Sequence, residues 1–320
     1  MQVLRGGFYW NLEPGGTAWR LLSARGRTAI VRSVRAAVPT IHLYDLQSRG
    51  LHARGDAMGL KRDVVAQAPD YIRGMAYSVD LHDRTALVTG ASRGIGRAVA
   101  LALARAGAAV AVNYRERHGE ADQVVADIRA LGRRALAAPA DVSVSHQVSA
   151  MVKSVTDALG TIDVLVNNAG VAVLRGIEDL DEAEFDRTLA VNLKSAFLCT
   201  QAVLPGMRVR RWGRIVNISS IAARGAGAIG VHYNASKAGL EGLTRGYAAR
   251  LAREGITVNA IAPGATETEM GALLSPDVLA RIPAGRFATP DEIAQGVLLI
   301  VGNAFITGQT IPINGGSMFT

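Results

Sequence analysis

Residues 85–107 read TALVTGASRGIGRAVALALARAG, and this stretch predicts how most of the chain folds. The run TALVT has the composition of a buried strand in a parallel sheet, and the apolar residues after Gly96 recur at helical spacing. Gly90, Gly94 and Gly96 lie between the two. Glycines in such a turn let the backbone approach a pyrophosphate, which the N–H groups and dipole at the start of the helix stabilise. The stretch therefore predicts a dinucleotide site, with a tight turn that binds nothing as the alternative.

Strand and helix patterns alternate from this stretch to the end of the chain. Seven strands separated by helices imply right-handed crossovers and a parallel sheet that is covered on both faces. We therefore expect a single α/β domain over residues 81–320, with a doubly wound Rossmann-type sheet of seven parallel strands and helices on both faces. After TALVT, the expected strands are 109–114, 134–142, 163–167, 214–219, 255–264 and 308–315. The expected helices are 97–107, 121–132, 148–160, 185–204, 233–243 and 290–301.

Composition fits a globular α/β protein and argues against several other classes. Apolar residues make up 49% of the 320 positions and charged residues 19%, which does not suit a disordered chain. The one cysteine, Cys199, excludes an internal disulfide and a multi-cysteine metal site, so we predict no metal and a reducing, cytoplasmic location. No apolar run is long enough to span a bilayer. Only four lysines are present, which argues against nucleic-acid binding.

A second stretch, NISSIAARGAGAIGVHYNASK at 217–237, carries the candidate chemistry. Residues i and i+4 of a helix share a face, so Tyr233 and Lys237 are expected side by side. Ser220 would lie at the carboxyl end of the preceding strand, where open α/β sheets bind their ligands. An ammonium beside a phenol favours the phenolate, so we expect Lys237 to lower the pKa of Tyr233. The three residues suit the addition of hydride to a ketone with protonation of its oxygen, or the reverse reaction.

Together these motifs resemble those of the short-chain dehydrogenase/reductase family in its compact form. The resemblance extends from Leu81 to Phe319 and is strongest to the 3-oxoacyl-[acyl-carrier-protein] reductases. It implies an oxidoreductase with one Rossmann-type domain that holds cofactor and substrate together. In chain order the motifs are TGASRGIG at 89–96, DV at 141–142, NNAG at 167–170, Asn192, Ser220 with Y-x-x-x-K at 233–237, and PG at 263–264.

The resemblance also implies roles for single residues. Tyr233 would donate and accept the proton, Lys237 would hold the nicotinamide ribose, and Ser220 would orient the substrate oxygen. Asn192 would keep a water in a proton relay toward Lys237, and a polar residue that only bridges its neighbours is the alternative. Besides Tyr233 and Lys237, the implied cofactor contacts are Gly90, Ser92, Arg93, Gly94, Ile95, Gly96, Asp141, Val142, Asn168, Ala169, Gly170, Pro263, Gly264, Thr266 and Thr268.

Charge at the end of the second strand favours NADP over NAD. Enzymes that use NAD generally place an acidic residue there to hold the ribose 2′-hydroxyl. Tyr114 stands at that place, Arg115 follows it, and Arg93 lies in the glycine turn. Two guanidinium groups would bind a 2′-phosphate through charge-assisted hydrogen bonds. Glu116 is close enough to weaken this preference.

The expected substrate class follows from the resemblance. It implies reduction of a 3-oxoacyl thioester, with an acyl carrier protein as a partner that arginines beside the site attract. Arg211 matches one such position, while Glu254 occupies the second and Arg253 adjoins it. The alternatives are a sugar, steroid or other secondary-alcohol dehydrogenase on the same scaffold, or a non-catalytic dinucleotide-binding protein. The intact catalytic set argues against the last.

Assembly as a homotetramer, or failing that a homodimer, is expected from the helices over 186–204 and 233–253. These helices carry more apolar side chains than one sheet can cover, and the resemblance implies that they pair with copies of themselves. The side chains in question are Phe197, Leu198, Leu240, Leu243 and Tyr247.

Residues 1–80 read unlike the rest and are expected to form a poorly ordered extension, with a helix over 18–38. Residues 1–82 carry 11 Lys and Arg against 6 Asp and Glu, whereas the remaining residues carry 24 against 21. Three interpretations of this basic segment remain. It is an organelle-import sequence, which would place the protein in an organelle matrix, or a basic arm, or sequence upstream of a natural start at Met75. We favour the last.

Overall fold

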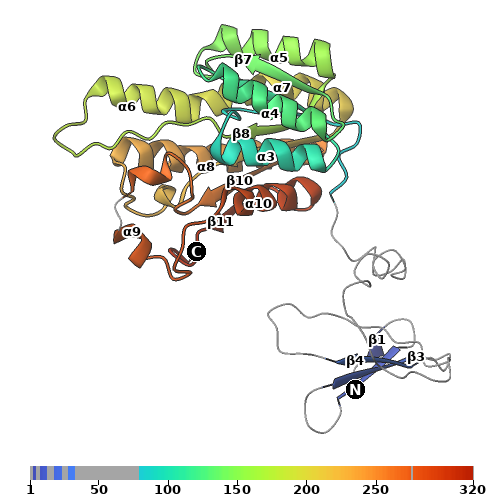
Figure 1. The fold of residues 1–320 in the computed structure, drawn as a ribbon. Coiled ribbons are helices and arrows are strands. Elements are labelled where there is room, and N and C mark those ends of the chain that lie inside the picture. Colours follow the sequence, from blue (N-terminus) through green and yellow to red (C-terminus); the bar gives the residue numbers. More distant parts are fainter. Residues whose placement is uncertain are drawn as a thin grey trace. The chain divides into compact units, whose positions relative to one another are not determined.

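In the computed structural model, a sheet of seven strands forms the centre of the unit Tyr77–Thr320 (Figure 1). The strands are β5 (Thr85–Val88), β6 (Ala109–Tyr114), β7 (Ala135–Pro139), β8 (Ile162–Asn167), β9 (Gly213–Ile218), β10 (Ile256–Pro263) and β11 (Thr310–Ile313). They lie in the order β11-β10-β9-β8-β5-β6-β7, and neighbouring strands are parallel. The predicted doubly wound, seven-stranded parallel sheet is confirmed. Its order reverses between β5 and β8, the kind of switch point at which such sheets bind ligands.

Helices cover both faces of this sheet. One face carries α3 (Gly94–Arg105), α4 (His118–Ala130) and α10 (Pro290–Gly302), and the other carries α5 (Ser145–Leu159), α7 (Ser195–Arg210) and α8 (Val231–Leu251). The shorter elements are α6 (Glu182–Leu189), a π-helical turn η1 (Ala190–Lys194), η2 (Ile221–Ala223), η3 (Ala252–Glu254), η4 (Gly271–Leu273) and α9 (Asp277–Ala280). No helix within the described residues has the length and apolarity that a membrane crossing requires.

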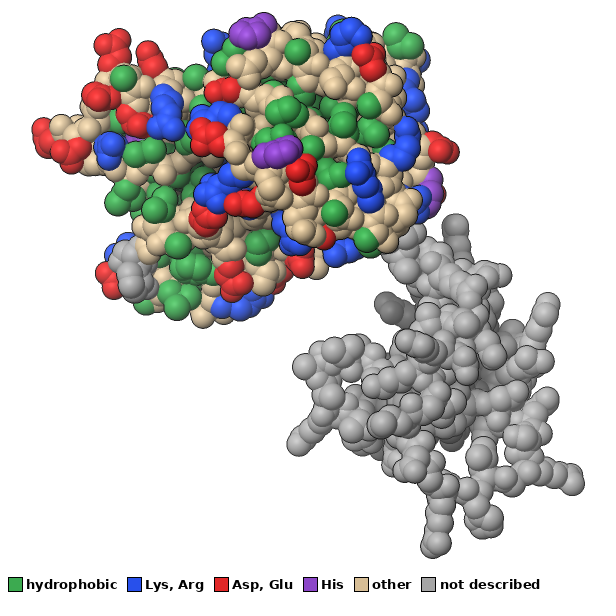
Figure 2. Space-filling model, turned by 45° about the horizontal axis from the view of Figure 1, so that its top comes forward, with side chains coloured by type: hydrophobic (Ala, Val, Ile, Leu, Met, Phe, Trp, Pro, Cys, Tyr) green, Lys and Arg blue, Asp and Glu red, His purple; other side chains and the backbone are tan. Residues whose placement is uncertain are grey.

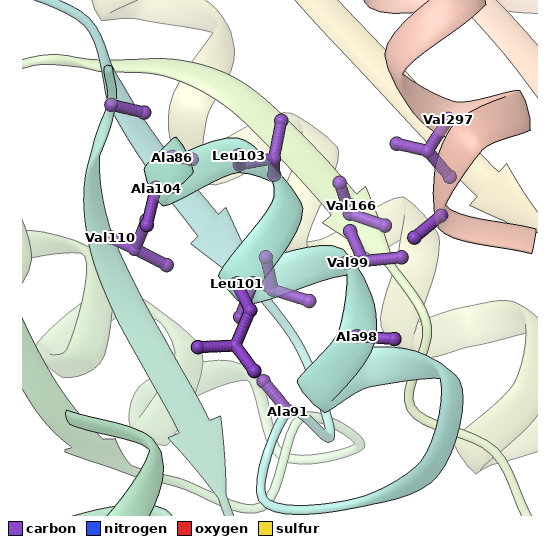
Figure 3. Packing of buried hydrophobic residues seen from close by; sticks show 14 of the residues in the cluster. Ala86, Ala91, Ala98, Val99, Leu101, Leu103, Ala104, Val110, Val166 and Val297 are labelled. Carbon is purple, nitrogen blue, oxygen red and sulfur yellow. The ribbon is translucent and has the colours of Figure 1, made fainter. Parts of the chain in front are cut away.

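Two apolar cores, one on each face of the sheet, hold these layers together. Strands β5, β6, β8, β9 and β10 are buried at every position, which explains why they read as nearly continuous apolar runs. Figure 3 shows Val99 and Leu103 of α3 packed near Val166 of β8 and Val297 of α10. This packing fixes where the carboxyl ends of the strands lie, and with them the site.

The structure describes residues 79–274 and 277–319, and of the first unit, Met1–Ala76, the strands alone. These are β1 (Val3–Leu4), β2 (Phe8–Leu12), β3 (Ala18–Ser23) and β4 (Thr28–Arg32), which form an antiparallel sheet in that order. The helix predicted over 18–38 is therefore wrong where β3 and β4 lie. The β-branched residues of the run TAIVR favour a strand, and this run pairs with β3. Met75 lies outside the described residues.

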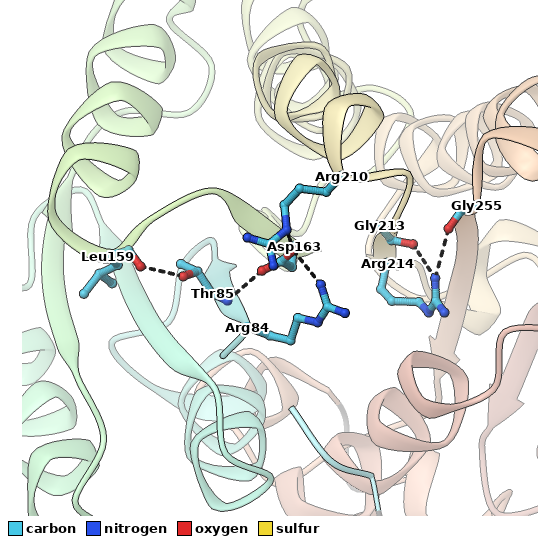
Figure 4. A network of polar contacts seen from close by, with 8 residues as sticks. All are labelled: Arg84, Thr85, Leu159, Asp163, Arg210, Gly213, Arg214 and Gly255. Atoms are coloured by element: carbon cyan, nitrogen blue, oxygen red, sulfur yellow. Dashed lines mark hydrogen bonds and ion pairs between the residues drawn. The ribbon is translucent and has the colours of Figure 1, made fainter. Parts of the chain in front are cut away.

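An ionic network around the buried Asp163 joins β5, β8 and α7 at the amino end of β8 (Figure 4). The Asp163 side chain is 1% exposed, and its carboxylate accepts hydrogen bonds from Arg84 at 3.2 Å and from the Thr85 backbone N–H at 3.1 Å. Arg210, at the end of α7, lies 3.0 Å from the same carboxylate. Asp163 is the buried member of the network, whereas Arg84 is 27% and Arg210 39% exposed, so loss of the carboxylate removes hydrogen bonds and leaves no buried charge unpaired.

We expect Asp163→Asn to lower the free energy of unfolding by roughly 1–3 kcal/mol, because the carboxylate's hydrogen bonds to Arg84 and to the Thr85 N–H are weakened or lost. Urea unfolding followed by circular dichroism measures this. Lys153→Ala, which breaks the exposed Lys153–Asp157 pair, is the matched control and should change little. Equal effects of the two substitutions would contradict the account.

Candidate active site

A cleft of about 1090 Å³ opens where the strands end. Its walls come from the segments that follow β5, β6, β8, β9 and β10, from the start of α8, and from the residues around α9. Of the predicted site residues, Asn192 alone does not line it. Those that do are Gly90, Ser92, Arg93, Gly94, Ile95, Gly96, Arg115, Asp141, Val142, Asn168, Ala169, Gly170, Ser220, Tyr233, Lys237, Pro263, Gly264, Thr266 and Thr268.

The glycine turn leaves the start of α3 open to a ligand. Gly94 has φ of 54°, which favours glycine, and a Cβ at Gly96 would overlap the Gly90 carbonyl oxygen. The residue before α3, Arg93, makes no side-chain capping hydrogen bond, so the first N–H groups of the helix are free for an anion. These features fit the pyrophosphate of a dinucleotide.

Two polar residues that sequence reasoning did not single out hold the turn in place. Asn113 of β6 accepts a hydrogen bond from the Gly90 N–H at 3.1 Å through its side-chain oxygen. The Thr89 hydroxyl accepts hydrogen bonds from the N–H groups of Asn168 at 2.9 Å and Ala169 at 3.0 Å. Asn113 could have been found as the one amide in the apolar strand AVAVNY, but its partner is set by the fold.

Ser220, Tyr233 and Lys237 meet in this cleft as predicted from their spacing. Ser220 lies two residues after the end of β9 and directly precedes η2, while Tyr233 and Lys237 lie on α8. The Ser220 hydroxyl accepts a hydrogen bond from the Ala222 N–H at 3.2 Å and lies close enough to the Tyr233 phenol to lower its pKa. The Lys237 ammonium lies 5.6 Å from the centre of the Tyr233 ring and donates to the Ile218 carbonyl at 2.8 Å. Both side chains are buried, with Tyr233 7% and Lys237 4% exposed.

The expected lowering of the Tyr233 pKa by Lys237 is wrong in this structure. Burial raises the pKa of Tyr233, and the hydrogen bond from Ser220 offsets this only in part. Burial also lowers the pKa of Lys237 to about 8. The lysine charge is directed at the Ile218 carbonyl, so the loss of water around the phenol dominates. A phenol that keeps its proton at neutral pH is suited to donating it.

Asn192 lies behind the cleft wall, inside the π-helical turn η1. Its side-chain oxygen accepts from the Val171 N–H at 2.8 Å, and its amide donates to the Val171 carbonyl at 3.0 Å and the Ser236 hydroxyl at 3.1 Å. A Cβ at Gly170 would lie 3.3 Å from that oxygen and 3.6 Å from the Lys237 ammonium. The Asn192 side chain therefore ties the NNAG segment to the catalytic helix, and its role toward a water stays a prediction.

The arginines predicted to favour NADP line the cleft, each with an acidic partner. Arg115 is paired with Glu116 and lies 3.8 Å from Asp141. Arg93 pairs with Glu269. Each of these side chains is at least a quarter exposed, so the pairs are weak and a phosphate can compete for the guanidinium groups. On the face in Figure 2, acidic and basic side chains are interspersed in the same way.

Comparison with known proteins gives consistent results. Residues 84–278 match the sequence model of the short chain dehydrogenase family. A 3-oxoacyl-[acyl-carrier-protein] reductase of Staphylococcus epidermidis is 43% identical over 244 residues, covering 73% of this chain and 98% of the relative. The (2S)-[(R)-hydroxy(phenyl)methyl]succinyl-CoA dehydrogenase subunit BbsD of Thauera aromatica is 42% identical over 242 residues, covering 74% and 97%. A crystal structure from Agrobacterium tumefaciens, provisionally named a gluconate dehydrogenase, has a TM-score of 0.72 at 35% identity and covers 75% and 98%.

Replacement of the buried lysine should alter how stability depends on pH. Between pH 8 and 10.5 the unfolded chain holds a proton at Lys237 that the folded chain has released, so stability rises with pH in this window. We expect Lys237→Met to remove that rise, which is roughly 1.4 kcal/mol for each pH unit. Urea unfolding at several pH values measures it, with Lys153→Met at an exposed lysine as the control. Parallel pH curves for the unmodified chain and Lys237→Met would contradict the burial argument.

Proposed function

Because the chain belongs to the short-chain dehydrogenase family, we propose that it is an NADP-dependent keto reductase that converts 3-oxoacyl thioesters to secondary alcohols. The observation that carries the proposal is that Ser220, Tyr233 and the buried Lys237 line one cleft, with the Ser220 hydroxyl beside the Tyr233 phenol. The same cleft holds the open start of α3, so a dinucleotide and a carbonyl compound can meet there.

The chain's own residues divide the work of the proposed reaction. NADPH, when bound, supplies the hydride that adds to the carbonyl carbon. Ser220 donates a hydrogen bond to the carbonyl oxygen and so orients the substrate. Tyr233 gives its phenolic proton to that oxygen. Burial raises the pKa of the phenol, so the proton stays on Tyr233 until the reaction. Lys237 donates hydrogen bonds to the ribose hydroxyls, and its lowered pKa suits it to return a proton to the phenolate.

The walls of the cleft beyond Ser220 support an acyl substrate. Most of the residues there are small or apolar, and the polar ones include Arg281 and Ser317. The relatives include enzymes named for acyl-carrier and acyl-CoA substrates, which supports the thioester class. The apolar residues of this wall are Ile221, Ala222, Ala226, Ala228, Ile229, Met270, Leu274, Val278 and Ile282.

Recognition of an acyl carrier protein would rest on one of the two expected arginines, because the second position is not an arginine. Glu254 stands at the second position, and its carboxylate is held by Arg208 through hydrogen bonds of 2.7 and 3.2 Å. The pairing neutralises the acid, so Arg211 and Arg253 still give this end of α7 and η3 a positive charge. We propose that coenzyme A thioesters and carrier-bound substrates are both accepted.

Self-association through α7 and α8 belongs to the same proposal. Phe197 on α7 is 44% exposed, a large apolar side chain that a second copy would cover. Leu240, which we expected at this interface, is 1% exposed and packs inside the protomer, so it does not contribute. We propose a homotetramer, or failing that a homodimer.

The proposed activity is tested by a panel of 3-oxoacyl thioesters, sugar ketones and steroid ketones with NADPH, followed by absorbance. We expect turnover of the thioesters, and a loss of about 10²–10⁴-fold in kcat for Tyr233→Phe because the proton donor is gone. Cofactor binding, measured by fluorescence, should change little in this variant. Faster turnover of a sugar or steroid ketone would show that the proposed thioester class is wrong. An active Tyr233→Phe variant would overturn the mechanism.

Cofactor preference is tested at Arg115. We expect Arg115→Ala to raise the Kd for NADPH about tenfold or more, since a hydrogen bond to a charged group contributes roughly 1.5–3 kcal/mol. The Kd for NADH should change far less. Arg129→Ala, at the far end of α4, is a control for removal of a guanidinium outside the cleft. Equal effects of Arg115→Ala on both cofactors would show that Arg115 does not recognise the 2′-phosphate.

A further inference from the structure

A carboxylate is buried one helical turn beyond the catalytic lysine. Glu241 follows Lys237 by four residues on α8, so the two share a face, and its side chain is 5% exposed. An ionised carboxylate this deep is costly unless it is paired and hydrogen-bonded. Neither the proton transfer nor the cofactor site proposed above uses it.

The partners of Glu241 come from the residues on both sides of Ser220. Arg224 donates from its Nε to one carboxylate oxygen at 2.9 Å. The Ser219 hydroxyl lies 3.5 Å from the other oxygen and donates to the Lys237 carbonyl at 3.2 Å. Arg245 is 3.9 Å away and 61% exposed, so it adds little.

These contacts tie the segment that carries Ser220 to the helix that carries Tyr233 and Lys237. Ser220 stands between Ser219 and η2, and Arg224 directly follows η2. Asn234 of α8 extends the tie, because its amide donates to the Gly225 carbonyl at 2.9 Å. The backbone after Ser220 is thus attached to α8 at consecutive points.

We propose that Arg224 and Glu241 are positioning residues for the catalytic serine. Resting on the proposed keto reduction, the inference is that their ion pair sets where the Ser220 hydroxyl lies relative to the Tyr233 phenol. Neither residue lines the cleft, so both act through Ser220. A displacement of about 1 Å in a catalytic group can cost 10²-fold in rate, which gives an ion pair to the buried Glu241 carboxylate a functional effect beyond stability.

The test compares Arg224→Gln and Glu241→Gln with the unmodified chain. We expect kcat to fall about 10- to 100-fold in each, with the Kd for NADPH within twofold, because the cofactor side is untouched. Arg224→Lys, which keeps a cation near Glu241, should recover most of the rate. Asp163→Asn is the control, since it breaks a buried ion pair at the amino end of β8 and should leave kcat unchanged while folded.

Hydrogen exchange gives a reading that needs no substrate. The backbone amides of residues 219–226 should exchange several-fold faster in both glutamine variants than in Asp163→Asn. If the unmodified chain reduced no ketone, the proposed function would fail. The exchange rates would still show whether the Arg224–Glu241 pair holds residues 219–226 against α8. The inference is overturned if exchange in 219–226 is unchanged, or if kcat falls no further in the glutamine variants than in Asp163→Asn. Should Glu241→Gln not fold, Arg224→Gln and Arg224→Lys decide the matter alone.

Discussion

The attachment of α8 to the carboxyl end of β9 is the contact on which the whole site depends. Lys237 donates to the Ile218 carbonyl at 2.8 Å, which fastens the catalytic helix to the last residue of the strand. Ser220 follows that strand by two residues, so the same contact brings the serine and the tyrosine to one place. Its cost is a buried ammonium, visible as the lowered pKa of Lys237.

A parallel sheet lets several strands place polar residues at the same site. All carboxyl ends meet at one edge, and each is followed by a turn that is free to carry polar groups. Asn167 of β8 and Asn217 of β9 pair across the sheet, and Asn217 donates to Thr244 of α8, each at 2.8 Å. These hydrogen bonds between side chains therefore connect β8, through β9, to the catalytic helix α8.

The sequence was sufficient for the sheet, because buried parallel strands read as apolar runs and the helices between them keep their spacing. It also brought Ser220, Tyr233 and Lys237 together, since strand end and helix face fix their places. It could not give the direction of the Tyr233 pKa shift, which depends on how fully water is excluded. It likewise missed the π-helical turn around Asn192 and the Arg224–Glu241 pair, because both depend on contacts between distant segments.

The expected helix over 18–38 failed for a related reason. Arginines among small apolar residues are compatible with a helix or with two strands, and pairing between β3 and β4 decided between them. A short run that is apolar at every position, as in the strand after Arg84, is recognised by its length and by the glycine turn that follows it. Inner strands of the central sheet were predicted correctly for this reason.

The central claim is that the Tyr233 proton and the cofactor hydride move to one substrate held in this cleft. Single-turnover rates measured in H₂O and D₂O, with NADPH and with NADPH deuterated at the transferred position, test it most directly. The account predicts that both isotopes slow the same step, and that the solvent effect disappears in Tyr233→Phe along with most of the rate. A hydride step that is insensitive to D₂O, or one whose solvent effect persists in Tyr233→Phe, would contradict it.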